Sequence, residues 1–355
     1  MTKRLLLLDD APIVGGAELF AIRLGTWLAA EPNDWDVTIV CPDPGPFAAR
    51  VRDAGLRAQG ARFPDLTPTA AVHWPGGIRD MGRVLRRAGA GGALVVANTA
   101  RAQAFAAAAR LSVRDAPPVV NLVHEQDTAA RRSAKVVLGR VGRVVAVGAN
   151  TAAAYERALP RQRIGRLNNF LDLAELDRAL ATRSPRAGDA PPVVGVLARL
   201  IPEKGLVELV EELATCPDDW SALRIGGGAQ DAAYAAALRG ATDRLGLGRR
   251  VELVGHVEDL PAFFAAVDTL VVPSTGHEGQ PTVILEALAY GVPVIVRAPI
   301  WSPDFDGLPV ARYATGDELS RALRVRPEPA SGDELRRRFG PQQALDALQA
   351  ANRLQ

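Results

Sequence analysis

Short, almost wholly apolar runs recur along this 355-residue chain, and each is followed by a segment with helical periodicity. A run of four to six aliphatic residues between turn residues is typical of a strand that is buried on both faces. Strands that alternate with helices form a parallel sheet with helices on both sides. The sequence therefore predicts an α/β fold.

The alternation occurs in two blocks, and a stretch rich in Pro and Gly at residues 182–192 separates them. We expect an N-terminal Rossmann-like domain at 1–181, a linker at 182–192, a C-terminal Rossmann-like domain at 193–330 and a final helical segment at 331–355. The expected strands are Leu5–Leu8, Asp36–Cys41, Arg62–Leu66, Ala93–Ala97, Pro118–Val123, Arg143–Val147, Val193–Leu197, Ala222–Ile225, Val251–Val254, Thr269–Val272 and Val292–Val296. The last helix is expected at Glu334–Leu354.

Composition limits the classes of function. A net charge of +2 gives no reason to expect a nucleic-acid partner. Two cysteines and four histidines are too few for a disulfide framework or a Cys/His metal cluster, so we expect no metal, no cofactor and a cytoplasmic protein. Asp9 and Asp10 end the first apolar run, which we interpret as a buried strand and not as a signal peptide.

The most informative stretch begins with the apolar run Thr269–Pro273 and continues to Glu286. It predicts a buried strand, a short loop and a helix that begins at Pro281, because proline suits the first helical position. The first free amides of that helix belong to Thr282 and Val283. They lie at the positive end of the helix dipole, where a phosphate binds well.

Two glutamates belong to the same stretch. Glu286 lies one turn beyond Thr282 in an otherwise apolar helix, and a carboxylate there needs a hydrogen-bonding partner. The ribose of a nucleotide would supply that partner. Glu278 in the loop would then face the group attached to the far end of the diphosphate.

Two cations follow the first strand of the second block. Arg199 and Lys204 flank a loop that leads into a helix near Gly205. A diphosphate needs such counter-charge, which arginine offers as a planar fork and lysine as a compact ammonium. The alternative is a solvated basic loop.

These motifs together resemble the retaining GT-B glycosyltransferases of family four. The resemblance rests on Pro-Ser at 273–274, Glu-Gly-Gln-Pro at 278–281, Glu286 and the segment Ala287–Val296. Arg199 and Lys204 match the family's Gly-Arg-Leu-x-x-x-Lys-Gly pattern, with Ala198 in place of its first glycine. The resemblance implies two Rossmann-like domains that face a cleft, with the last helix returning to the first domain. It also implies that a sugar moves from a UDP- or GDP-linked donor to a hydroxyl of a glycan, lipid-linked sugar or small molecule, without a metal.

The resemblance assigns roles to individual residues. Glu278, His124, Arg199 and Lys204 would take part in catalysis, and whether Glu278 attacks covalently is left open. Gly15, Asn98 and His124 would lie on the acceptor side. The donor would contact Gly16, Arg199, Lys204, Gly226, His256, Val257, Glu278, Gly279, Gln280, Pro281, Thr282, Val283 and Glu286.

Several of these assignments have a plain structural alternative. Gly226–Gly228 is equally explained by a tight strand-to-helix turn, and His124 by an ordinary structural hydrogen bond. Asn169–Asp172 matches a family element near the hinge, where we expect a structural turn. The segment Ala298–Gly307 is only loosely similar to the family pattern, so no donor role is assigned to it.

Three further interpretations stay open. A sugar-nucleotide epimerase could use the same scaffold, and so could a non-catalytic subunit that binds sugar nucleotides. A cluster of basic residues suggests peripheral contact with an anionic membrane at its inner face, the alternative being a solvated face. That cluster consists of Arg131, Arg132, Lys135, Arg140 and Arg143.

Overall fold

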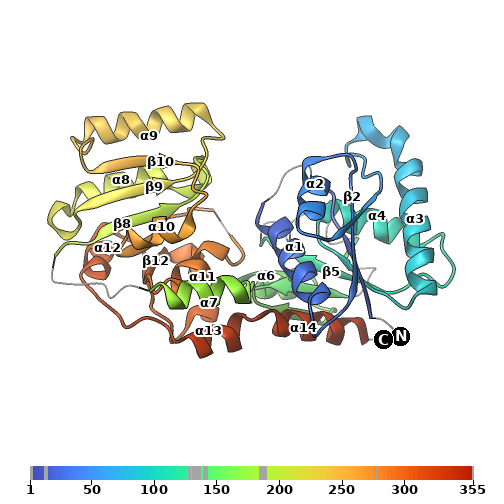
Figure 1. Ribbon diagram of the computed structural model, residues 1–355. Helices are drawn as coiled ribbons and strands as arrows, with labels where there is room; N and C mark the ends of the chain where they lie inside the picture. The colour runs from blue at the N-terminus through green and yellow to red at the C-terminus, as the bar shows by residue number, and fades with distance from the viewer. Residues whose placement is uncertain are drawn as a thin grey trace. The chain divides into compact units, whose positions relative to one another are not determined.

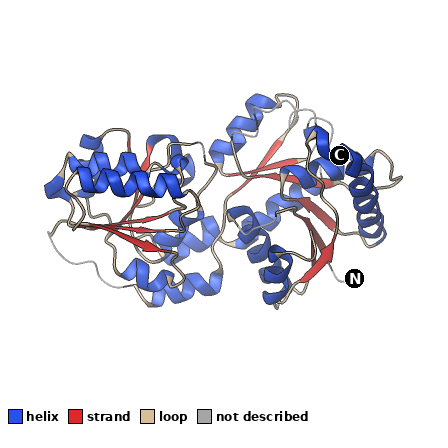
Figure 2. Cartoon of the chain, turned by 90° about the horizontal axis from the view of Figure 1, so that it is seen from above, coloured by secondary structure: helices blue, strands red, loops and turns tan. Residues whose placement is uncertain are grey.

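The computed structural model describes residues 3–11, 15–126, 129, 137–138, 143–183, 190–276 and 278–353. The chain divides into two compact units, one formed by residues 1–172 and 341–355 and the other by residues 173–340. Each unit is built on one parallel sheet with helices on both of its faces (Figures 1 and 2). The predicted pair of Rossmann-like sheets is confirmed.

The first unit contains a seven-stranded sheet in the order β3-β2-β1-β4-β5-β6-β7. Strands β1, β4, β5 and β6 form its buried centre, because all of their side chains except Arg4 and Asn121 are aliphatic. The strands are β1 Arg4–Leu8, β2 Asp36–Cys41, β3 Arg57–Gly60, β4 Leu94–Ala97, β5 Val119–Val123, β6 Val144–Val147 and β7 Ile164–Leu167. The helices are α1 Gly16–Ala29, α2 Pro46–Asp53, α3 Trp74–Ala90, α4 Ala100–Arg110, α6 Ala149–Ala158 and α14 Pro341–Arg353, with a 3-10 turn at Pro68–His73.

The second unit contains a six-stranded sheet in the order β10-β9-β8-β11-β12-β13, and all of its strand pairs are parallel. Its strands are β8 Val193–Leu197, β9 Ala222–Gly226, β10 Val251–Gly255, β11 Thr269–Val272, β12 Val294–Arg297 and β13 Val310–Tyr313. Its helices are α7 Leu173–Ala181, α8 Leu206–Ala214, α9 Ala232–Arg244, α10 Leu260–Ala265, α11 Thr282–Ala289, α12 Gly316–Leu323 and α13 Gly332–Phe339. Short 3-10 turns lie at Pro202–Lys204, Pro217–Asp219, Ala298–Ile300 and Pro303–Phe305.

The expected single helix at the end of the chain is in fact two helices. Gly340 separates α13 from α14, and Pro341 opens α14 because a proline cannot continue a preceding helix. Only α14 packs with the first unit, where Gln343 exchanges two hydrogen bonds of 3.0 and 2.9 Å with the backbone of Asn168. The return of the chain to the first unit is therefore confirmed.

The sequence analysis missed three strands, and polarity explains why. β3, β7 and β13 lie at the ends of the two sheets and mix polar with apolar residues, so none of them forms an apolar run. The strand expected at Arg62–Leu66 is wrong, because the third strand lies earlier, at Arg57–Gly60.

The boundary between the units also differs from the expected one. Helix α7 belongs to the second unit, where it packs against α11 and α13. Arg183, at the start of the stretch expected to be a linker, is held in that unit as well. Its guanidinium donates hydrogen bonds of 2.9, 2.8 and 2.8 Å to the carbonyl oxygens of Ala289, Leu288 and Ala330. Two of these carbonyls, of Leu288 and Ala289, end α11, and the Leu288 oxygen also accepts from the Gly291 amide at 3.1 Å.

The predicted basic cluster falls largely outside the described residues, because Arg131, Arg132, Lys135 and Arg140 are not described. Arg143 is described, and its Nη1 donates to the carbonyl oxygen of Asn352 on α14 at 2.9 Å. Arg143 therefore anchors a helix of its own unit. Within the described part of the chain, no helix combines the length and the apolar character that crossing a bilayer requires.

Replacing Arg183 with Ala removes all three of its hydrogen bonds. We expect the free energy of unfolding to fall by about 2 kcal/mol in urea titration, because charged donors to buried carbonyls contribute more than neutral ones. The matched control is Arg178→Ala, which removes an exposed arginine of α7 and should change stability by less than about 0.5 kcal/mol. Equal effects in the two variants would contradict the assignment.

Candidate active site

In each sheet the strand order reverses at one point, between β1 and β4 in the first unit and between β8 and β11 in the second. Ligands of open parallel sheets bind outside the carboxyl ends of the strands at such a reversal. The predicted site residues follow these strands. Arg199 and Lys204 follow β8, Glu278 to Glu286 follow β11, Asn98 follows β4 and His124 follows β5, one strand further along.

In the second unit, the loops that follow β8 and β11 contact each other directly. The carbonyl oxygen of Glu203 accepts hydrogen bonds from the amides of Thr275 at 3.0 Å and Gly276 at 3.4 Å. Gly205 has a φ of 63°, and a Cβ placed on it would lie 2.3 Å from the carbonyl oxygen of Pro273. Only glycine fits at this position, so Gly205 allows the two loops to meet.

The meeting of these loops brings two predicted site residues together. Lys204 Nζ donates to Glu278 Oε1 at 2.8 Å, and both side chains are mostly buried, with 19% and 25% of their surface exposed. Arg199 lies elsewhere on the same edge. It is exposed, and its Nη1 donates to Gln230 Oε1 at 3.1 Å, on the loop that follows β9. The structure therefore pairs Lys204 with the β11 loop and Arg199 with the β9 loop.

Helix α11 begins one residue later than expected. Pro281 is the residue before the helix, with φ −59° and ψ 124°, so it has the helical φ but an extended ψ. The amides of Thr282 and Val283 find no acceptor among the residues that the structure describes. They begin the helix at the carboxyl end of β11, as the sequence predicted, and they suit an anion.

The remaining predicted residues between Glu278 and Glu286 are buried. Glu286 is buried on α11 with 9% of its surface exposed, and Gln280 is 4% exposed. Gly279 is also buried. His277 lies outside the described residues.

The glycine run after β9 has a packing explanation. A Cβ on Gly226 would lie 2.6 Å from side-chain carbons of Leu197 and Val257, and a Cβ on Gly227 would lie 1.8 Å from the carbonyl oxygen of Ala198. Gly227 also has a φ of 150°. Gly226 and Gly227 thus let the loops after β8 and β9 pack closely, which agrees with the structural alternative. His256 is exposed in the adjacent loop after β10.

In the first unit, a hydrogen-bonded group of polar side chains lies at the carboxyl ends of β1, β4 and β5 and consists of Asp9, Asn98 and His124. Asn98 is 2% exposed, and its Nδ2 donates to Asp9 Oδ2 at 2.7 Å and to the carbonyl oxygen of Ala17 at 2.9 Å. Its Oδ1 lies 2.8 Å from His124 Nε2. Asn98, which the resemblance places on the acceptor side, is enclosed and holds His124 in place.

Burial shifts the pKa of both ionisable members of this group. It lowers the pKa of the His124 imidazole to about 4, so the ring is neutral at pH 7. Phe20 packs against the ring edge-on, with the ring centroids 5.6 Å apart. Burial raises the pKa of the Asp9 carboxyl to about 7; the Asn98 and Ala11 hydrogen bonds oppose the shift, and the charges of Glu18 and Asp10 add to it. The sequence analysis treated Asp9 only as the end of a strand, although a carboxylate directly after a central strand was the available signal.

The glycines before α1 have a capping role. The amide of Gly15 donates to Glu18 Oε2 at 2.7 Å, and α1 begins at Gly16. Glu18 therefore caps α1 from inside its first turn. Gly16 is exposed, and no atom lies within 4 Å of a Cβ placed on it.

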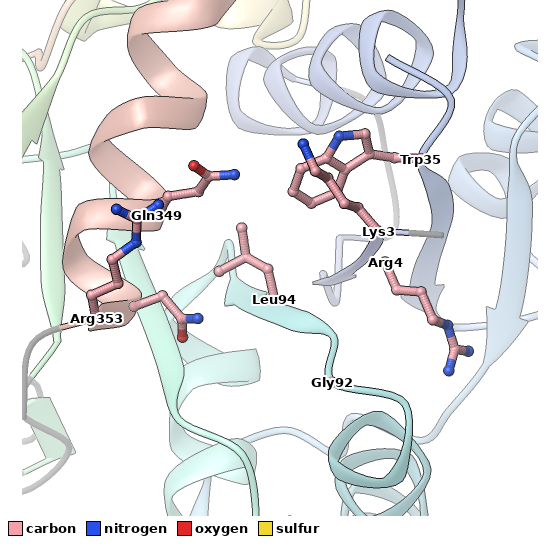
Figure 3. Close-up of a pocket in the computed structure, with 8 residues that line it drawn as sticks. Lys3, Arg4, Trp35, Gly92, Leu94, Gln349 and Arg353 are labelled. Atoms are coloured by element: carbon pink, nitrogen blue, oxygen red, sulfur yellow. The ribbon is translucent and has the colours of Figure 1, made fainter. Parts of the chain in front are cut away.

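A depression in the first unit lies at the opposite edge of the sheet. It has a volume of about 260 Å³ and is lined by residues at the amino ends of β1, β2 and β4 and by α14. Figure 3 shows Gln349 and Arg353 on one side, Lys3 and Trp35 on the other, and Leu94 between them. Arg4, which also lines it, pairs with Asp36 at 3.3 Å. Because ligands of parallel sheets bind at the carboxyl edge, this depression is not part of the candidate site.

Comparison with known proteins agrees with this geometry. Residues 14–175 match the family model "Glycosyltransferase Family 4", and residues 191–304 match "Glycosyl transferases group 1". A segment of 129 residues is 33% identical to the lipopolysaccharide core biosynthesis glycosyltransferase LpsE of Rhizobium meliloti. A match over 123 residues is 30% identical to the lipopolysaccharide core biosynthesis mannosyltransferase LpsB of the same organism. These matches cover 36% and 34% of this chain and 36% and 35% of the relatives, so the chain spans about a third of their length.

Solved structures are similar over the whole chain. The crystal structure of HepE from Anabaena in complex with UDP has a TM-score of 0.74 at 22% identity and covers 98% of this chain and 100% of its own. A glycosyltransferase from Rickettsia africae has a TM-score of 0.77 at 13% identity, with full coverage of both chains. The fold is therefore that of the GT-B glycosyltransferases, and two segments of the chain match glycosyltransferase family models.

Replacing Gly205 with Ala tests the contact between the two loops. We expect the free energy of unfolding to fall by about 2 to 4 kcal/mol, because the new Cβ meets the Pro273 carbonyl and the positive φ disfavours alanine. Gly228→Ala is the control on the same edge, since no atom lies within 4 Å of its Cβ position. Chemical denaturation of both variants gives the comparison, and a Gly205→Ala protein as stable as the control would refute the contact.

Replacing Asp9 with Asn tests the buried carboxyl through pH. Because the folded-state pKa of Asp9 is raised to about 7, its favourable contribution to stability is complete below about pH 4 and is lost as the pH rises through 7. An asparagine at this position does not titrate, so we expect the stability of the variant relative to the wild type to increase by about 2 to 4 kcal/mol between pH 4 and pH 8. Urea titrations at several pH values measure it, and a difference independent of pH would show that Asp9 titrates normally.

Proposed function

We propose that this protein is a retaining glycosyltransferase that moves a sugar from a UDP- or GDP-linked donor to a hydroxyl group. The observation that carries the proposal is the ion pair between Lys204 and Glu278, on the loop that leads into α11. A cation and two free amides at this point suit the diphosphate of a sugar nucleotide. The matches to two glycosyltransferase family models support the reaction class.

The names of the similar proteins support a choice of donor and acceptor class for this chain. HepE was crystallised with UDP and with UDP-glucose, and LpsE and LpsB act in lipopolysaccharide core biosynthesis. For this chain we propose a nucleoside-diphosphate sugar as donor and a glycan as acceptor. A cytoplasmic location and contact with an anionic membrane stay predictions from the sequence.

The proposed chemistry depends on charge that develops on the leaving diphosphate. As the bond between sugar and phosphate breaks, negative charge grows on the diphosphate oxygens. The ammonium of Lys204 and the amides of Thr282 and Val283 stabilise that charge, so they lower the barrier and do not merely bind the substrate. Arg199, on the same loop as Lys204, adds counter-charge at the same edge. We propose that the reaction needs no metal, since these groups neutralise the diphosphate.

The ion pair between Lys204 and Glu278 has a consequence for binding. When the diphosphate arrives, its oxygens compete with Glu278 for Lys204. Because both side chains are mostly buried, Lys204 needs an anionic partner, and the diphosphate supplies one as Glu278 leaves. The released carboxylate of Glu278 then faces the sugar, where it binds hydroxyls or stabilises positive charge at the reacting carbon. Glu286, one turn into α11, holds the ribose, and the neutral His124 accepts a hydrogen bond from a sugar or acceptor hydroxyl.

Two substitutions test the proposal. Lys204→Ala should weaken UDP or GDP binding by about 10- to 100-fold in calorimetry, because one charge-assisted contact is lost. Glu278→Gln should keep nucleotide affinity within about threefold and reduce turnover at least about 100-fold. Arg239→Ala, which removes an exposed arginine of α9, should change neither.

Turnover is measured as nucleoside diphosphate released from a panel of sugar nucleotides, with and without acceptors. Release that depends on an acceptor supports a transferase. Conversion of the donor without release indicates an epimerase, and binding without either reaction indicates a non-catalytic subunit. Either of the last two results would contradict the proposal, as would nucleotide affinity that is unchanged by Lys204→Ala.

A further inference from the structure

The hydrogen bonds around Asn98 fix which way its amide faces. One of its side-chain atoms lies 2.7 Å from Asp9 Oδ2 and 2.9 Å from the carbonyl oxygen of Ala17. A backbone carbonyl can only accept, so that atom must be the amide nitrogen. The amide oxygen is therefore the atom 2.8 Å from His124 Nε2.

The same reasoning fixes the proton on the histidine. An amide oxygen cannot donate, so His124 Nε2 must carry the hydrogen of this bond. Burial lowers the pKa of the imidazole to about 4, so the ring carries a single proton at pH 7. Nδ1 then holds a lone pair, and none of the described residues donates a hydrogen bond to it. Nδ1 is an acceptor and cannot donate.

We propose that Asp9 and Asn98 are positioning residues, which hold His124 in the tautomer that presents the Nδ1 lone pair to a substrate hydroxyl. The inference rests on the proposed function, since it assumes that a hydroxyl-bearing sugar or acceptor binds at this edge. It makes His124 a fixed hydrogen-bond acceptor that orients a hydroxyl, and not an acid that donates a proton.

The environment of Asp9 supports a role beyond folding. Its side chain is fully enclosed, and it accepts hydrogen bonds from the Ala11 amide and from Asn98. Within the described residues no lysine or arginine pairs with it, and the neighbouring charges of Glu18 and Asp10 are both negative. A buried carboxylate without a cation costs stability, so a neutral side chain would serve a purely structural role better. Its position does, however, fix the Asn98 amide, on which the His124 tautomer depends.

The tautomer can be read directly by NMR of protein labelled with ¹⁵N-histidine, at about pH 7.5 and without ligand. Long-range couplings from the ring protons distinguish a proton on Nε2 from one on Nδ1. His124→Gln identifies the His124 signals among the four histidines. We expect the wild type to show the Nε2–H form alone.

Substitutions of Asp9 and Asn98 then remove the hydrogen bonds that hold His124. Asp9→Leu and Asn98→Leu remove the acceptor and the amide, so we expect mixed tautomers and a fall of kcat/KM by about 10- to 100-fold, mainly in kcat. Asp9→Asn has one acceptor oxygen for the two donors that Asp9 accepts from, the Ala11 amide and Asn98, so we expect a smaller change of tautomer and of kcat/KM than in Asp9→Leu. The control is Gln103→Leu, which removes another buried amide of the same unit, one that donates to the Leu122 carbonyl at 2.8 Å. It should change neither.

The results separate this inference from the proposed function. A wild type with the proton on Nδ1, or tautomers unchanged in Asn98→Leu, overturns the positioning inference even if sugar transfer is normal. Altered tautomers with unchanged kcat also overturn it. A wild type that transfers no sugar from any nucleotide donor overturns the proposed function, whatever the tautomer. Urea titration of each variant confirms that it folds.

Discussion

The close contact between the loops that follow β8 and β11 is the constraint on which the candidate site depends. Gly205 makes it possible, because any side chain there would meet the carbonyl oxygen of Pro273. The contact sets Lys204 against Glu278, four residues before Thr282, with which α11 begins. Both loops flank the point where the strand order reverses, so the topology of the sheet brings Lys204 and Glu278 together. The chemistry proposed for the protein follows from that convergence.

Much of the fold could be predicted because its central strands are aliphatic on both faces. Strands β2, β8 and β11 have the bounds that the sequence predicted. The missed strands β3, β7 and β13 are partly polar and lie at sheet ends, where burial does not enforce an apolar run. The break at Gly340 was missed because the apolar periodicity of α13 continues into α14, although Pro341 was visible in the sequence.

In the candidate site, features within one short stretch of sequence could be predicted, but contacts between distant residues could not. The helix tip at Thr282 and the carboxylate of Glu278 could be predicted, because both follow a strand in one short stretch. The pairing of Glu278 with Lys204, 74 residues away, needed the strand order. The link from Asp9 through Asn98 to His124 needed it even more, because these residues follow β1, β4 and β5. Sequence patterns named His124 but gave no reason to join it to Asp9.

A structure of the protein with bound UDP or GDP is the most direct measurement of the central claim. The claim predicts that the terminal phosphate accepts hydrogen bonds from the amides of Thr282 and Val283, with Lys204 Nζ within about 3.5 Å of a phosphate oxygen. It also predicts that Glu278 has left Lys204. A phosphate bound instead at the depression between Lys3 and Arg353, or at any place away from the start of α11, would contradict it.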